Sequence, residues 1–163
     1  MPEPIRYVER LRAHYESQVF PPYDWTIHED APLRGLAKPL ADCRVSMLTS
    51  GGVSQCSAPA WNPDARNDFR LDAVPRDAPS DAFQIHDAYY DHRGADRDLN
   101  CVFPIDRLRE LEADGIIGDV APRLWSGFMG RIYKRRAVIE EHAPALAHEL
   151  ANDGVDLFLL VPA

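Results

Sequence analysis

The sequence predicts an α/β protein: a small three-layer sandwich with a mainly parallel sheet and a long irregular loop in its first half. Short apolar runs typical of buried strands alternate with stretches in which apolar residues recur every three or four positions, as in helices. Strands that are joined through helices pair in parallel, with right-handed crossovers. Ten of the 14 prolines precede residue 80, so irregular chain is expected to concentrate there.

The composition fits one domain and excludes several classes of function. The 163 residues carry 18 basic and 26 acidic side chains, a net charge of −8, which disfavours nucleic acid as a partner. No apolar run approaches the ~18 residues of a membrane span, and the charged N-terminus lacks a signal-peptide core. We therefore expect a cytoplasmic protein with no membrane partner. Three cysteines without a close pair argue against a disulfide framework and a Cys-rich zinc site.

The first 42 residues are expected to form an N-terminal helix and a wrapping connector, ahead of an α/β core over 43–163. An apolar stripe at helical spacing marks the helix and consists of Ile5, Val8, Leu11, Tyr15 and Val19. Pro21 and Pro22 should end it. In the connector that follows, Trp25 and Leu36 are candidate anchors.

The core should begin with a strand at 43–49 that stops at Ser50-Gly51-Gly52. Glycines at the end of a strand leave backbone N–H groups accessible to an anion. Residues 53–80 are rich in Pro, Asp and Asn and predict a long loop, of a length that is usually functional or disordered. A weaker strand is expected at 82–86.

The second half should supply two helices and a final strand. One helix is expected to begin at Pro104, whose missing N–H costs nothing there. Residues 116–133 mix small and aromatic side chains and predict a packed loop. A helix over 134–153 should be kinked by Pro144. The apolar run 155–161 is typical of a buried parallel strand.

Three segments should meet at one edge of this sheet, because ligands of open parallel sheets lie beyond the carboxyl ends of the strands. These segments are 50–52, His86-Asp87 and Pro162-Ala163. The last strand has no following helix to cover it. We therefore expect the domain to be completed by a partner or by residues absent from this sequence.

A dense polar stretch precedes the helix at 104 and allows three interpretations. It contains His86, Asp87, Tyr90, Asp91, His92, Asp96 and Asp98. It is either a hydrogen-bonded loop in which Asp98 or Asn100 caps the coming helix, or a substrate-positioning site with His86 as general acid. The third interpretation is a metal site, but the spacing matches no metal signature, so we predict none.

Several stretches resemble the glycine/betaine/sarcosine/D-proline reductase selenoprotein B family. They are residues 44–53, 86–91, 95–111, 121–130 and 153–162. The block from Asp98 to Leu111, followed by Phe128-Met129-Gly130, is the most specific of them.

The resemblance implies reductive cleavage of a carbon–heteroatom bond in a small amino acid or amine. In that family an apolar strand ending in Val-Pro leads into a selenocysteine or cysteine, whose anion attacks the substrate carbon, and a thiol resolves the product. A pyruvoyl group sits on a partner subunit. Because this sequence stops at Ala163, we expect it to be C-terminally incomplete, through a misread UGA codon or a deliberate cut, and to hold no cofactor itself.

The candidate residues follow from these interpretations. Catalytic candidates are His86, Asp91 and Cys56; substrate-binding candidates are Thr49, Ser50, Gly51, Gly52, Asp98 and Asn100. Expected partners are a small-molecule substrate, a reductase subunit or thiol reductant, and further copies in a homo-oligomer. Two alternatives stay open: a non-catalytic subunit of the same fold, and a metal-dependent hydrolase using the polar stretch.

Overall fold

The computed structural model describes residues 4–21, 29–30 and 34–163, in two units, 1–35 and 36–163. The first unit contains helix α1 (Tyr7–Ser17), whose predicted apolar stripe is exposed along its length. The helix ends before the two prolines, and Val19 takes a left-handed φ of 66°. Trp25 lies outside the described residues. No helix in the described ranges is long and apolar enough to cross a membrane.

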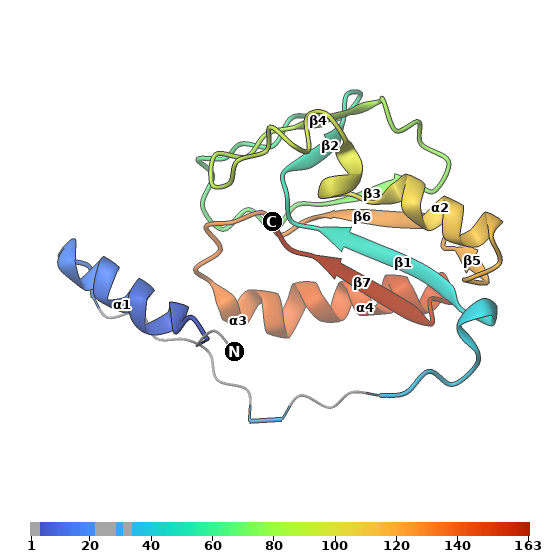
Figure 1. The fold of residues 1–163 in the computed structure, drawn as a ribbon, viewed down its shortest axis with the longest axis horizontal. Helices are drawn as coiled ribbons and strands as arrows, with labels where there is room; N and C mark the ends of the chain where they lie inside the picture. The colour runs from blue at the N-terminus through green and yellow to red at the C-terminus, as the bar shows by residue number, and fades with distance from the viewer. Residues whose placement is uncertain (1–3, 22–28, 31–33) are drawn as a thin grey trace. The chain divides into compact units, whose positions relative to one another are not determined.

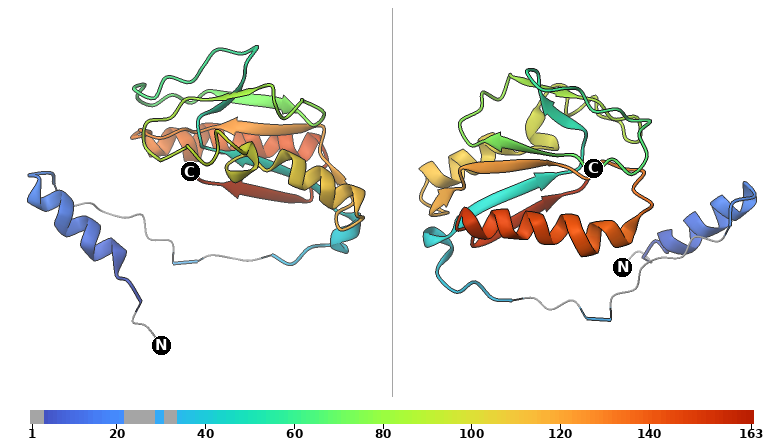
Figure 2. Two further views of the ribbon diagram at one scale, coloured as in Figure 1. Left: turned by 45° about the horizontal axis from the view of Figure 1, so that its top comes forward. Right: turned by 180° about the vertical axis from the view of Figure 1, so that it is seen from behind.

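The second unit is a three-layer α/β sandwich, as the sequence predicts. Its strands are β1 (Arg44–Thr49), β2 (Val53–Gln55), β3 (Leu71–Pro75), β4 (Phe83–Ile85), β5 (Asp119–Val120), β6 (Arg123–Gly127) and β7 (Leu157–Val161). Its helical segments are η1 (Leu40–Asp42), η2 (Leu99–Cys101), α2 (Ile105–Ala113), α3 (Arg135–Ala137), η3 (Val138–His142) and α4 (Ala143–Asn152). Helix α2 covers one face of the sheet, and α3, η3 and α4 cover the other (Figures 1 and 2).

Strand β1 is the centre of the main sheet. It pairs in parallel with β7 on one side and with β5 and β6 on the other. Strand β3 adds antiparallel to β6, while β2 and β4 form a separate antiparallel pair. The prediction of at least three parallel strands is confirmed.

Alternate side chains of β1 supply two cores, as the period of a strand requires. Val45 and Met47 pack on the α2 side, around the fully buried Phe103. Leu48 packs on the other side with Trp125 and Leu146 of α4.

Two loop predictions were wrong. Residues 53–80 contain β2 and β3, and residues 116–133 contain β5 and β6, the latter inside the sheet. The sequence did not predict strand β6, because two of its five residues, Ser126 and Gly127, are poor strand formers. Ser126 nonetheless donates its hydroxyl to the Val53 carbonyl, and a Cβ on Gly127 would lie 2.7 Å from the Arg70 carbonyl oxygen. Tertiary packing therefore selected small residues there.

The last helix deviates where the sequence predicts a kink. A π-helical turn, η3, separates α3 from α4 just before Pro144. Proline has no N–H to donate four residues back, and its ring collides with that carbonyl, so a wider turn relieves the clash.

Candidate functional site at the carboxyl end of the sheet

The carboxyl ends of β1, β6 and β7 lie side by side. Thr49 is in register with Ser126 on one side and with Val161 on the other. The Ser50 N–H donates to the Val161 carbonyl at 3.3 Å, and the Ala163 N–H reaches the Ser50 hydroxyl at 3.3 Å. Figure 1 shows the C-terminus beside the end of β1. The sheet therefore brings together two of the three segments expected at this edge, 50–52 and 162–163.

Gly51 is held by side chains from two directions. Its N–H donates to the Thr49 hydroxyl at 3.1 Å, and its carbonyl accepts from the Tyr90 hydroxyl at 2.9 Å. A Cβ on Gly51 would lie 3.2 Å from both the Ala163 Cβ and the Tyr90 oxygen. The backbone after β1 thus leaves the sheet through a narrow slot, where a side chain would fit only if the Ala163 side chain and the Tyr90 hydroxyl moved by a few tenths of an ångström.

Gly52 brings the third expected segment to this edge. Its φ is +65°, and an added Cβ would lie 2.5 Å from the His86 carbonyl oxygen. The His86 N–H donates to the Gly52 carbonyl at 2.9 Å, while its imidazole is exposed. The next residue, Asp87, is buried and accepts the Tyr89 N–H at 2.8 Å. His86 and the glycines are therefore neighbours through their backbones.

Tyr90 is a neutral donor at this edge. Burial, with smaller contributions from Asp87 and Asp96, raises the pKa of the Tyr90 phenol to about 12. The hydroxyl therefore keeps its proton at any physiological pH and holds the Gly51 carbonyl. The sequence placed Tyr90 in the polar stretch but gave no sign of this contact.

The loop after β6 is a strained part of the same edge that sequence reasoning missed. Phe128 and Arg131 are non-glycine residues with φ of 53° and 61°. Asn67, itself at φ 53°, accepts the N–H groups of Tyr133 and Lys134 on its side-chain oxygen at 2.8 and 2.9 Å. Strained non-glycine residues tend to cluster where a site must be held in shape.

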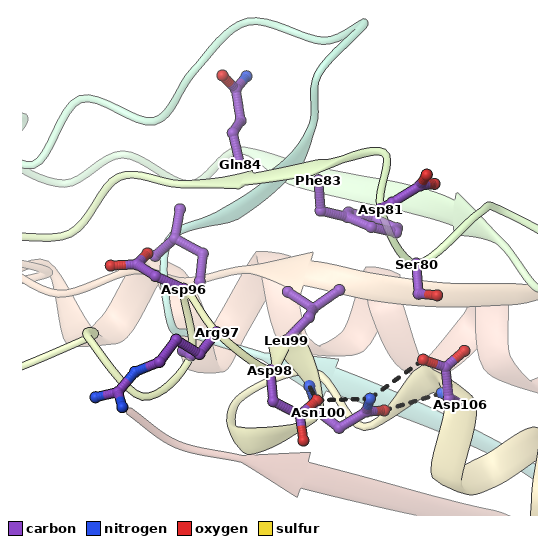
Figure 3. A pocket seen from close by; sticks show the side chains of 12 residues that line it. Ser80, Asp81, Phe83, Gln84, Asp96, Arg97, Asp98, Leu99, Asn100 and Asp106 are labelled. Carbon is purple, nitrogen blue, oxygen red and sulfur yellow. Dashed lines mark hydrogen bonds between the residues drawn. The ribbon is translucent and has the colours of Figure 1, made fainter.

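A polar pocket of about 450 Å³ lies between β4 and the segment before α2 (Figure 3). Asp98 accepts the Asn100 N–H at 3.0 Å and so caps η2. Hydrogen bonds to Asn100 lower the pKa of the Asp98 carboxyl. The Asn100 side chain also bridges to Asp106 at the start of α2, at 3.1 Å. Asp96 and Phe83 line the same pocket.

The expected site residues therefore fall into separate groups. Thr49, Ser50, Gly51, Gly52 and His86 lie together at the carboxyl end. Asp98 and Asn100 lie in the polar pocket. Asp91 is exposed and paired with Arg93, whose hydrogen bonds lower the pKa of the Asp91 carboxyl.

None of the three cysteines lies at the carboxyl edge. Cys56 is exposed at the far end of the β2–β4 ladder from Gly52, where its N–H donates to the Ala82 carbonyl. Cys43 is buried before the amino end of β1, and Cys101 is exposed in η2. In the part of the chain that the structure describes, no group of three His, Cys, Asp or Glu side chains is arranged to hold a metal ion.

Comparison with known proteins gives the family. The model of the glycine/sarcosine/betaine reductase selenoprotein B family matches residues 13–163. The chain is 31% identical over 156 residues to D-proline reductase subunit gamma of Acetoanaerobium sticklandii, covering 96% of this chain and 60% of that protein. It is 30% identical over 132 residues to glycine reductase complex component B subunit gamma of Carboxydothermus hydrogenoformans, covering 76% and 28%.

A third relative extends the range of substrates in these names. Sarcosine reductase complex component B subunit beta of Peptoclostridium acidaminophilum is 27% identical over 107 residues, covering 61% of this chain and 23% of that protein. No solved structure matches. The chain thus spans about three fifths or less of the relatives it resembles. On the match to residues 13–163, the chain belongs to the glycine/sarcosine/betaine reductase selenoprotein B family.

Proposed function

We propose that this chain forms the scaffold and the substrate edge of a reductase subunit that cleaves a carbon–heteroatom bond in a small amino acid or amine. The observation that supports this most directly is the convergence of β1, β6 and β7 at a glycine-lined edge, in a chain of this family. Open parallel sheets bind ligands at that edge.

The redox residue of this proposal lies outside residues 1–163. A nucleophilic selenolate or thiolate has to reach the substrate carbon, and Cys43, Cys56 and Cys101 all lie away from the carboxyl edge. The selenolate or thiolate of the redox residue would form a bond to the substrate carbon as the carbon–nitrogen bond breaks and the amine leaves, and a dithiol would then cleave the carbon–chalcogen bond, releasing the reduced product and ending as a disulfide. Cys56 stays a candidate resolving thiol only if the two-stranded β2–β4 sheet moves.

Residues of this chain bind and orient the substrate. The Ser50 N–H and the Gly51 N–H are engaged by the Val161 carbonyl and the Thr49 hydroxyl, so the substrate carboxylate is held by the Ser50 hydroxyl, which accepts the Ala163 N–H and keeps its own proton to donate. His86 donates a proton to the leaving amine. Asp91, ionised near neutral pH beside Arg93, takes part as a charge and not as a proton donor. Asp98 and Asn100 shape the polar pocket beside this edge.

The partners in this proposal are other reductase subunits and a thiol reductant, in the cytoplasm. The relatives are named as subunits of reductases, two of them expressly of multicomponent complexes. A pyruvoyl group for substrate activation would be carried by such a subunit and not by this chain.

The test uses the native protein from its source cells. Intact mass and selenium content of the polypeptide are measured, and amine release from glycine, sarcosine, betaine and D-proline is followed with a dithiol. We expect a native polypeptide longer than 163 residues that carries selenocysteine or cysteine. Its His86→Asn variant should lose the amine-releasing activity. A native 163-residue polypeptide that reduces these substrates at full rate would overturn the placement of the redox residue.

A non-catalytic subunit is the second candidate, favoured by the absence of any cysteine from the carboxyl edge. It predicts that the native complex retains its activity when His86→Asn is introduced. The metal-dependent hydrolase has no donor set among the described residues.

A further inference from the structure

A surface beside the carboxyl edge is built from two loops that the proposed function leaves unused. Asn67 joins the loops 64–68 and 128–134, because its side-chain oxygen accepts the N–H groups of Tyr133 and Lys134 at 2.8 and 2.9 Å. The two loops therefore form one continuous surface, although these partners are 66 and 67 positions apart in the sequence. We call this surface the Arg131 face; its members are Arg66, Tyr89, Arg131, Tyr133 and Lys134.

Arg131 lies beside two exposed tyrosines. Its side chain is hydrogen-bonded to Tyr133, which raises the pKa of the Arg131 guanidinium, and the nearby Tyr89 adds to this shift. The same guanidinium donates to the Asp64 carbonyl at 3.0 Å and lies 3.5 Å from its carboxylate. Tyr133 and Tyr89 are 66% and 59% exposed. Tyrosine and arginine are enriched at the energetic centres of protein interfaces, so this group has the composition of a docking surface.

The Arg131 face is basic in an acidic chain. Residues 64–68 and 131–140 carry five basic and three acidic side chains, whereas the whole chain has a net charge of −8. Arg66 and Lys134 are exposed, and among the described residues no carboxylate forms an ion pair with either of them. Their charges are therefore available to a partner of opposite sign.

Lys134 contributes nothing to the helix that it precedes. It is the N-cap residue of a helical run that continues through η3 and α4, and α3 has no acidic residue in its first turn. Ser, Thr, Asp and Asn are preferred at this position, and a cation there opposes the helix dipole. Arg136, in contrast, pairs with Glu140 at 3.1 Å and is not counted in the face. A residue that costs local stability is better explained by a role outside the chain.

The backbone of the face is fixed before any partner arrives. Asn67, Phe128 and Arg131 have φ of 53°, 53° and 61°, a region that non-glycine residues rarely adopt. The Asn67 N–H also donates to the Arg131 carbonyl at 3.1 Å, so each loop holds the other in its strained form. A surface that is already ordered loses less entropy when it binds.

The face borders the carboxyl edge. The Tyr90 hydroxyl holds the Gly51 carbonyl at 2.9 Å, and the preceding Tyr89 lies against the loop after β6, since a Cβ on Gly130 would be 4.0 Å from its ring. Figures 1 and 2 show this loop leaving the sheet beside the C-terminus. A protein bound to the face would therefore sit next to the edge where the substrate binds.

We propose that the Arg131 face docks an acidic surface of another protein. Resting on the proposed function, that protein is a further subunit of the reductase, which the face holds beside the carboxyl edge. A nucleic acid or an anionic membrane fits less well, because its extended negative surface would also meet the acidic remainder of the chain. A protein has to present only one cluster of carboxylates.

The affinity between the native full-length subunit and the other components of its reductase, measured without substrate, tests the proposal. We expect one component to bind, and to bind at least about tenfold more weakly after Lys134→Glu or when salt rises from about 50 to 500 mM. Arg107→Glu is the matched control, because it makes the same charge change at an exposed arginine on α2. Changing one carboxylate of that component to lysine should restore binding to Lys134→Glu, which a merely structural role of Lys134 would not allow. Equal affinities of Lys134→Glu and the wild type would overturn the proposal.

A photo-cross-link identifies the class of partner independently of affinity. With p-benzoylphenylalanine in place of Tyr133, irradiation of the source cells should join the native protein to an acidic segment of a reductase component. The same group in place of Ile116, which is 49% exposed after α2, should not give that product. Cross-links to nucleic acid or lipid instead, or no cross-link at all, would overturn the proposal. Neither measurement uses the reduction, so an inactive complex that still cross-links contradicts the proposed function alone.

Discussion

The two ends of the central sheet are held by different kinds of contact. At the amino end, Arg44 pairs with Asp119 at 3.0 Å, and Arg123 pairs with Asp153 at 2.8 Å and with Glu149 at 2.7 Å. At the carboxyl end, the contacts between strand exits are neutral hydrogen bonds and close backbone approaches.

This difference suggests that the amino end of the sheet stabilises the fold, while the carboxyl end is left free to bind a ligand. Ion pairs at the amino end tie β1 to β5 and β6 to α4 without occupying the edge where ligands bind. The carboxyl end is shaped by glycines and a neutral phenol, so a charged substrate entering there meets no internal ion pair that it would have to break.

The largest effect is expected from Gly52→Ala. The residue has φ +65°, and the new Cβ would lie 2.5 Å from the His86 carbonyl oxygen, so both strain and a backbone clash oppose it. We expect the free energy of unfolding to fall by about 2–4 kcal/mol, measured by urea denaturation. Gly94→Ala is the control, because nothing lies within 4 Å of its Cβ position. Equal losses in both variants would mean that the close approach at Gly52 is not formed.

The amino end should give the next largest effect, through Arg123→Met. Arg123 bonds Asp153 and Glu149, which together raise the pKa of its guanidinium, and the Asp153 carboxylate would be left largely buried without its partner. The expected loss in the free energy of unfolding is about 1–2 kcal/mol, and it should shrink in an Asp153→Asn background.

Arg136→Met is the matched control for the amino end. Arg136 is an exposed arginine that pairs with Glu140 one helical turn away, so its loss should cost less than about 0.5 kcal/mol. If Arg136→Met proved as costly as Arg123→Met, the amino-end pairs would have no special share in stability.

Tyr90→Phe sharpens the comparison at the carboxyl end. Loss of its hydrogen bond to Gly51 should cost about 0.5–1.5 kcal/mol near neutral pH. The folded-state pKa of about 12 lies above the ordinary value of 10.0, so the contribution is complete below pH 10 and is lost as the pH rises through 12. Urea denaturation at pH 9 and pH 11.5 should therefore show a steeper alkaline loss for the wild type than for Tyr90→Phe. Tyr89→Phe, at an exposed tyrosine, should follow the wild type.

Much of the fold could be predicted because its signals are local. The strand β1, the parallel strand β7, the stripe of α2 and the Pro144 kink each follow from patterns within a few residues. The expected burial of β7 was wrong, because it pairs only with β1 and leaves Leu160 63% exposed. Strand β6 could not be predicted, since Ser126 and Gly127 are chosen by contacts with Val53 and Arg70, which lie far away in the sequence. Long-range packing overrode the local propensity.

The candidate site also has features with a local sequence signal and features that depend on long-range packing. The glycines Gly51 and Gly52 after the first predicted strand allowed the carboxyl edge to be predicted. In the structure, the parallel pairing of β1 with β7 brings Ala163 to that edge. The hydrogen bond from Tyr90 to Gly51 could not be predicted, because the two residues are 39 positions apart and the placement of β2, β3 and β4 between them decides where that phenol lies. The strained Phe128 gave no sequence signal, since left-handed φ is rare for phenylalanine.

The smallest effect on stability is expected from Asp91→Asn, a candidate catalytic residue near the carboxyl edge. Hydrogen bonds from Arg93 lower the pKa of the Asp91 carboxyl, but both side chains are exposed and solvent screens the pair. The urea midpoint should therefore stay at the wild-type value from pH 6 to 8. In the native reductase, the same substitution should lower kcat/KM if Asp91 acts on the substrate, whereas Arg136→Met, which removes an exposed arginine on α3, should leave kcat/KM unchanged. A shifted midpoint would show that the ion pair stabilises the loop, and a change in rate could then no longer be assigned to contact with substrate.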